Sequence, residues 1–267
     1  MLRVAADSLR GAWENVNYAI LENPKELVEN CSSNAAFIDG IELDIGWAKG
    51  DDLDLGEIGY TKAKWTHLLK GYFFPESYYK ALAAAQEYLG KKQRPPVGII
   101  FYGERLTKES VGIASSAGPC LLSMSFSWRY DNPTPRVFVH SRSSDVSKKF
   151  YADCCFIYTI IRSFAADLGF DHTRVTIEWR IDRALQSVDY LPVYLLKTFG
   201  IEDPDELHTV FTDIDHKWWK HIIKAWPDEN TTSKYLTRQR AIDDYWKEIN
   251  GVARPRVPAS ELVLPYA

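Results

Sequence analysis

The chain lacks several features that would assign a protein to a class at once. It contains only four cysteines, and their spacing matches no metal-binding pattern. The adjacent pair Cys154-Cys155 lies in an apolar run, so a reduced, cytoplasmic compartment is the simpler expectation. No apolar run approaches membrane-spanning length, and the first residues lack the apolar segment of a secretory signal. We therefore expect no membrane partner.

Concentrated positive charge is also missing. Lys and Arg are scattered without a basic block, and the formal net charge is −4. Because nucleic-acid-binding proteins present a basic patch or stripe, direct binding to nucleic acid is not expected. No internal repeat or low-complexity segment stands out. The 267 residues, 46% of them hydrophobic, suffice for one large globular domain or two small ones.

Hydrophobic periodicity predicts a mixture of helices and strands. Residues 7–29 have a helical pattern with Asp7 or Ser8 as the N-cap, and Pro24 is expected in the first turn of a second short helix. The strands expected further along are 36–47, a buried strand over 97–102, and 175–181. The helices expected are 75–89, 154–169, 181–187, and two or three more within 204–246.

The stretch 115–153 carries the strongest chemical signal. Cys120 follows a Gly-Pro pair and precedes an alternating apolar run over 122–128. The turn cluster Tyr-Asp-Asn-Pro-Thr-Pro separates this run from a second extended run, a pattern that predicts a β-hairpin. Arg142 and Ser143 follow the second run, so they should lie close to Cys120. The pattern predicts a nucleophile beside an anion-binding cluster.

Each of these residues also has a plainer interpretation. A lone cysteine such as Cys120 is most often a small buried hydrophobe. An arginine near an aspartate, such as Arg142 near Asp145, is usually a solvated pair of little energetic consequence. Composition alone favours these structural roles over catalytic ones.

The order of the motifs resembles the core of the thymidylate synthase superfamily: Pro-Cys, a hairpin, Arg-Ser-x-Asp-Val, and then a long apolar helix. Leu121 stands where the synthases carry a His after the Cys, which makes the chain most similar to the pyrimidine nucleotide hydroxymethylases. The resemblance implies a single α/β (α+β) domain over residues 1–267, with a mixed, twisted β-sheet flanked by helices. It also implies a homodimer formed through the sheet face.

The resemblance assigns roles to the hairpin residues. Cys120 would attack C6 of a pyrimidine nucleoside monophosphate, while Arg142 and Ser143 hold its 5′-phosphate and Asp145 belongs to the same substrate-binding cluster. A thiolate suits this attack because it is strongly nucleophilic and leaves well. A cationic neighbour such as Arg142 would help it to ionise. The activated C5 would take a one-carbon unit from the co-substrate 5,10-methylenetetrahydrofolate.

Two further catalytic candidates lie before the hairpin. Glu57 opens an octet, 57–64, that resembles the Glu-Leu-x-Trp segment of the family, whose Glu organises water and assists proton transfer. Its alternative role is that of a surface acid in an acidic loop. Tyr72 falls where the family has a Tyr that helps to remove the C5 proton, and its alternative role is that of a core tyrosine.

Two family motifs are replaced in this chain. The paired arginines that reach the partner subunit's phosphate are absent before the 97–102 strand, so Arg94 or Lys92 would substitute for them. The His and Tyr that hold the sugar 3′-hydroxyl correspond to Ala184 and Gln186. The choice between ribose and deoxyribose therefore stays open.

Asp153 is predicted to distinguish the bases. The synthases have an Asn here, whose carboxamide donates to O4 and accepts from N3–H, which matches uracil. An ionised carboxylate only accepts, so it takes a hydrogen bond from the cytosine 4-amino group and repels O4. A proton on Asp153 or on cytosine N3 makes the pair bidentate. The alternative role for Asp153 is to cap a helix that begins at Cys154.

The sequence therefore predicts an enzyme that hydroxymethylates C5 of a cytidine nucleotide, CMP or dCMP, with water as the final nucleophile. Two alternatives remain. One is thymidylate synthase-type methylation of dUMP, and the other is a nucleotide-binding family member without folate chemistry. The apolar tail over 262–267 is expected to dock, since the C-terminus of this family folds over the bound folate.

Overall fold

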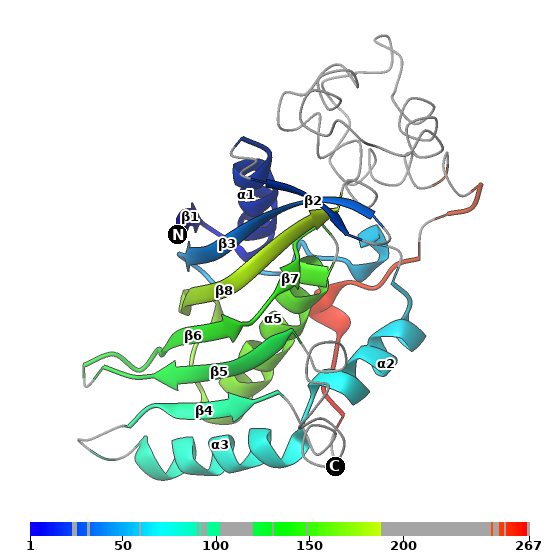
Figure 1. Cartoon of the computed structure of the whole chain (residues 1–267). Coiled ribbons are helices and arrows are strands. Elements are labelled where there is room, and N and C mark those ends of the chain that lie inside the picture. Colours follow the sequence, from blue (N-terminus) through cyan, green and yellow to red (C-terminus); the bar gives the residue numbers. More distant parts are fainter. Residues whose placement is uncertain are drawn as a thin grey trace, which may run out of the picture.

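The described part of this computed structural model comprises residues 1–22, 26–30, 33–58, 60–89, 91, 95–101, 120–129, 131–147, 149–187, 247, 251–253 and 255–265. They form a mixed sheet of eight strands with helices packed against one of its faces (Figure 1). The expectation of a mixed α/β fold is confirmed.

The sheet joins strands from both halves of the chain. Its order is β1-β3-β8-β6-β5-β4, with β2 paired to β3 and β7 paired to β8. The pairs β1–β3, β6–β8 and β7–β8 are parallel, and the other pairs are antiparallel. The strands are β1 Leu2–Ala6, β2 Glu26–Asn30, β3 Ser33–Ile45, β4 Val97–Ile100, β5 Leu121–Ser127, β6 Arg136–Ser141, β7 Ser144–Asp145 and β8 Thr176–Ser187.

The described helices are α1 Leu9–Glu22, α2 Lys62–Tyr72, α3 Pro75–Tyr88 and α5 Lys149–Leu168, with short 3₁₀ turns η1 Leu55–Ile58, η2 His172–Arg174 and η5 Ala259–Glu261. The predicted N-cap Ser8 is confirmed, since its hydroxyl accepts the Gly11 N–H at 3.0 Å. Gly169 ends α5 with a φ of 75°, a conformation that favours glycine at this position.

Helix α5 forms the centre of the core. It lies behind the sheet in Figure 1 and contacts both α1 and α3. Phe164 stacks on Phe126 of β5 with ring centroids 4.3 Å apart, and Phe150 meets Trp179 of β8 edge-on at 4.8 Å. The predicted apolar helix over 154–169 is thus confirmed, but it begins earlier, at Lys149.

The predicted hairpin is also present. Strands β5 and β6 pair antiparallel, with a register irregularity between Leu121 and Ser123. The irregularity shifts the alternation by one residue at the start of β5, as a bulge does. Leu121 is therefore buried beside Met124 and Phe126, whereas Leu122 is only half-buried.

Two predicted helices are strands. The segment placed in a second short helix after Pro24 contains β2, which pairs with β3 as a hairpin. The predicted helix over 181–187 is the continuation of β8, because β3 on one side and β7 on the other supply hydrogen-bonding partners as far as 185–187. In both places strand pairing between distant residues outweighs the local helical preference.

Two further segments depart from expectation. The strand β4 is an edge strand with one exposed face, where Ile100 is 44% exposed, so it is only half-buried. Helix α2 was not expected, and it begins after Thr61, whose hydroxyl accepts the Lys64 N–H at 3.2 Å. No described helix is long and apolar enough to cross a membrane.

The docking expected of the C-terminal tail is confirmed for its described residues. Leu262 and Leu264 are both buried, and the Arg162 guanidinium of α5 donates to the carbonyls of Ser260 and Leu262. The helices predicted within 204–246 lie outside the described residues.

Candidate active site

The hairpin brings Cys120 beside the Arg142-Ser143 pair. Leu121 pairs with Ser141, so the residues just outside each strand end are neighbours. The Arg142 N–H donates to the Cys120 carbonyl at 3.0 Å, and the Ser143 hydroxyl lies 3.6 Å from the Cys120 sulfur. The predicted proximity of Cys120 to Arg142 and Ser143 is confirmed for the Arg142 backbone and the Ser143 hydroxyl.

Tyr72, at the end of α2, reaches the same cluster. The backbone N–H of Cys120 donates to its phenol oxygen. Burial, and then the nearby carboxyl of Asp153 and thiol of Cys120, hold the pKa of Tyr72 well above its usual range. The phenol therefore keeps its proton at neutral pH and can donate a hydrogen bond beside the thiol.

Asp153 lies inside the first turns of α5 and is only 1% exposed. The suggestion that it caps a helix beginning at Cys154 is wrong, because the helix already begins at Lys149. Burial raises the pKa of its carboxyl to about 7, although Lys149 and a hydrogen bond from Ser144 act in the opposite direction. Both protonation states are thus populated near neutral pH.

Among the described residues, the Asp145 carboxyl is hydrogen-bonded to Ser147 and not to the thiol. One of its carboxylate oxygens accepts from both the backbone N–H and the hydroxyl of Ser147, which closes a local turn. Val146 anchors this turn, since its N–H donates to the Leu185 carbonyl at 2.7 Å and its carbonyl accepts from Trp13 at 2.8 Å. The loop after β6 is therefore rigidly held.

Glu57 occupies a different environment. The interpretation as an acid on the surface is wrong, because Glu57 is buried in η1. Its two oxygens accept from the Arg10 guanidinium at 3.0 and 2.6 Å, a bidentate pair. Arg10 also donates to the Tyr151 hydroxyl at 3.2 Å, which links the pair to α5.

The remaining predicted residues are less informative. Arg94 and Lys92 lie outside the described residues. Gln186 turns inward and donates to the backbone carbonyl of Asn17 at 2.9 Å and to its side-chain oxygen at 3.0 Å, while Ala184 is buried. Strand β8 thus binds α1 through Gln186.

The described cysteines differ in accessibility. Burial raises the pKa of the Cys154 and Cys155 thiols well above their usual range, whereas Cys120 is half-exposed. Reactive cysteines need exposure as well as a favourable charge environment. Cys120 is accordingly the best nucleophile candidate of the three. The described residues contain no group of three or more His, Cys, Asp or Glu side chains that could hold a metal ion.

The sequence patterns did not indicate three residues of this neighbourhood: Arg10, Ser144 and Tyr151. Arg10 shares a helix face with Trp13 and Asn17, both of which are buried, and a charge on an apolar helix face could have indicated a buried ion pair. Ser144 carried no comparable signal.

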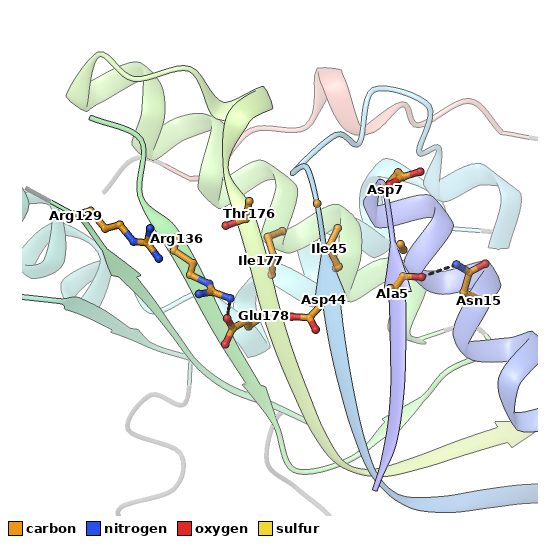
Figure 2. Close-up of a pocket in the computed structure, with 12 residues that line it drawn as sticks. Ala5, Asp7, Asn15, Asp44, Ile45, Arg129, Arg136, Thr176, Ile177 and Glu178 are labelled. Atoms are coloured by element: carbon orange, nitrogen blue, oxygen red, sulfur yellow. Dashed lines mark hydrogen bonds and ion pairs between the residues drawn. The ribbon is translucent and has the colours of Figure 1, made fainter. Parts of the chain in front are cut away.

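A hollow of about 670 Å³ lies away from the thiol, beside the sheet face that no described helix covers, here called the uncovered sheet face (Figure 2). There Arg136 of β6 points toward Glu178 of β8, with which it forms an ion pair, and Asn15 of α1 donates to the Ala5 carbonyl. None of the residues that line this hollow is a predicted site residue.

No known protein-family model matches the chain, and no curated protein matches it.

Proposed function

We propose that the chain is a folate-dependent pyrimidine nucleotide hydroxymethylase that acts on CMP or dCMP. The observation that carries this proposal is the cluster around Cys120. Its thiol is half-exposed and lies within 3.6 Å of the Ser143 hydroxyl, and its backbone is hydrogen-bonded to Tyr72 and Arg142. A nucleophile, an anion-binding pair and a buried carboxyl next to one another suit covalent chemistry on a nucleoside monophosphate.

The phosphate end of the nucleotide would be bound by Arg142 and Ser143. The guanidinium can donate two parallel hydrogen bonds to phosphate oxygens, and the hydroxyl can donate a third. Since Ser143 also contacts the thiol, binding there would bring C6 of the base near the Cys120 sulfur.

The base would be read by Asp153. In its ionised form the carboxyl accepts from the cytosine 4-amino group and repels O4 of uracil, and a proton on cytosine N3 would add a second hydrogen bond. Cys120 would add to C6, which makes C5 nucleophilic toward the one-carbon unit. After the C5 proton has passed to solvent and tetrahydrofolate has left, water would add to the exocyclic methylene, and the bond between Cys120 and C6 would break to release the thiolate. Tyr72 lies beside Cys120 and, because its phenol keeps its proton, would assist this reaction as a hydrogen-bond donor and not as the base.

The co-substrate 5,10-methylenetetrahydrofolate would supply the one-carbon unit. A cavity of about 340 Å³ between α2 and the C-terminal segment could hold part of this molecule, such as its pterin or its benzoyl ring. The buried indole nitrogen of Trp65, which lines this cavity, has no hydrogen-bond partner among the described residues. Trp65 and Tyr72 both pack edge-on against Phe156, so the cavity and the thiol cluster share a neighbour.

The uncovered sheet face would carry the homodimer contact. It bears the exposed apolar side chains of Ile100 and Phe138 next to a hollow of about 560 Å³. These two side chains would supply apolar contact area to the interface, beside charged residues such as Arg136 and Glu178 that could form ion pairs across it. Sedimentation as a dimer at micromolar concentration is the expected result, and a fully active monomer would contradict it.

Incubation with each of CMP, dCMP and dUMP, plus methylenetetrahydrofolate, tests the proposed reaction. The expected product has the mass of a 5-hydroxymethyl cytidylate, whereas a methyl product would identify a synthase. Cys120→Ser should abolish turnover and leave nucleotide binding almost unchanged, because a hydroxyl is far less nucleophilic than a thiolate. Substantial residual turnover in this variant would exclude Cys120 as the nucleophile.

A further inference from the structure

Ser144 lies between the proposed phosphate-binding residues and the carboxyl that would read the base. It belongs to β7 and is 1% exposed, and its backbone position is set by pairing with Ala184 of β8. The Ser144 hydroxyl donates to Oδ2 of Asp153 at 3.5 Å. Among the described residues, it is the side chain that hydrogen-bonds to this carboxyl.

Several other groups influence Asp153 without such a bond. They come from each element packed against it: Tyr72 of α2, Asp145 of β7, and Lys149, Cys154 and Cys155 of α5. Lys149 favours the ionised carboxyl, whereas burial and Asp145 oppose it. The protonation of Asp153 is therefore a balance that one hydrogen bond can shift.

We propose that Ser144 is a positioning residue that orients the Asp153 carboxyl and thereby sets the base preference. This inference rests on the proposed function, because the ligand of Asp153 is taken to be a pyrimidine base. With Oδ2 bound to the hydroxyl, Oδ1 is the oxygen left for the base.

The direction of the preference follows from hydrogen-bond chemistry. An ionised carboxyl accepts from the cytosine 4-amino group but repels O4 of uracil. A neutral carboxyl can turn its O–H toward either base, so it discriminates less. Removal of the Ser144 hydroxyl takes away one of the two influences that oppose burial and leaves Lys149 as the other, so the equilibrium moves further toward the neutral form. The loss should weaken the preference for cytidylate over uridylate.

Two variants test this proposal, so that the test still holds if one of them fails to fold. Ser144→Ala removes the donor and some volume, and Ser144→Cys retains volume with only a weak donor. In both, the pKa of Asp153 should rise by about one unit, a tenfold shift in the protonation equilibrium. The titration can be followed by NMR of ¹³C-labelled aspartate carboxyls and assigned with Asp153→Asn. Ser147→Ala is the matched control, since that buried hydroxyl binds Asp145 instead, and it should leave the Asp153 titration in place.

The second readout is the ratio of kcat/KM for cytidylate and uridylate nucleotides. We expect this ratio to fall about fivefold at pH 7 in both Ser144 variants, because a rise of the Asp153 pKa from about 7 to about 8 lowers the ionised fraction from about one half to about one tenth. An unchanged Asp153 titration, or an equal loss on both bases, would overturn the role of Ser144. A wild-type protein that converts no pyrimidine nucleotide would instead refute the proposed function, while the titration would still test the bond to Asp153.

Discussion

Two buried carboxyl groups of this protein reach opposite electrostatic solutions. Glu57 lies in an ion pair with Arg10, and both side chains are almost completely buried. Asp153 is equally buried, but its hydrogen bond comes from the Ser144 hydroxyl, and Lys149 acts on it without an ion pair among the described residues. A buried charge must be paired or neutralised. Glu57 is paired, whereas burial raises the pKa of Asp153 to about 7.

The difference indicates which carboxyl suits chemistry. The pair of Arg10 and Glu57 has many bonds: Arg10 also donates to the Asp52 carbonyl at 2.7 Å and to Tyr151. Tyr151 in turn accepts the Asp54 N–H at 2.9 Å, so the pair joins α1, the 51–58 segment and α5. Asp153 can gain or lose a proton near neutral pH and lies near the thiol, as functional carboxyls often do. We infer that Glu57 is chiefly an anchor.

Breaking the ion pair should have the largest effect. Arg10→Met leaves Glu57 buried without its cation, and we expect a loss of about 3–5 kcal/mol in the free energy of unfolding, measured by urea denaturation. The double variant Arg10→Met/Glu57→Met removes both charges and should recover most of this loss. A single variant as stable as the wild type would show that the pair contributes little.

The pH dependence of stability should separate the two carboxyls. Because the pKa of Asp153 is raised to about 7 in the folded state, that state holds a proton which the unfolded chain has released above about pH 4. Stability should therefore fall as pH rises from about 4 to 7, by up to about 1.4 kcal/mol per pH unit from this group. Other groups titrate as well, so the measurement is the difference between wild type and Asp153→Asn in urea denaturation. Identical profiles would contradict the raised pKa.

Base preference should change when the carboxyl of Asp153 is replaced by a carboxamide, which does not titrate. Asp153→Asn is expected to shift kcat/KM from cytidylate toward uridylate, because each unpaired buried polar group costs about 1–3 kcal/mol. Two such mismatches correspond to a factor of roughly tens to thousands. An equal loss on CMP, dCMP, UMP and dUMP would instead indicate a purely structural role in α5.

The smallest effect is expected at an exposed ion pair. Lys80 and Glu76 lie one turn apart on α3, and both are largely exposed. Glu76→Gln should change the free energy of unfolding by no more than about 0.5 kcal/mol, because water and salt screen the charges. Urea denaturation beside Arg10→Met compares the two pairs directly. A loss comparable to that of Arg10→Met would show that burial is not what makes the inner pair important.

Local patterns in the sequence were sufficient for the hairpin and the main helices. Alternation around a Pro-rich turn predicted β5 and β6, and with them the proximity of Cys120 to Arg142 and Ser143. The apolar periodicity of α1, α3 and α5 likewise predicted helices, and Ser8 and Gly169 identified two of their ends. These signals depend on residues close in sequence, so a single chain is enough to recognise them.

Only the tertiary structure decided which residues meet across long distances. Arg10 and Glu57 are separated by 47 positions, and no local pattern indicates that they pair. The strand character of β2 and of the end of β8 depends on hydrogen-bonding partners in β3 and β7. The same holds for Asp153. The sequence shows that a carboxyl stands at this position, whereas its burial and its bond to Ser144 result from packing. The physical reason is that the state of a carboxyl depends on the surrounding dielectric and charges, which exist only once distant segments have packed together.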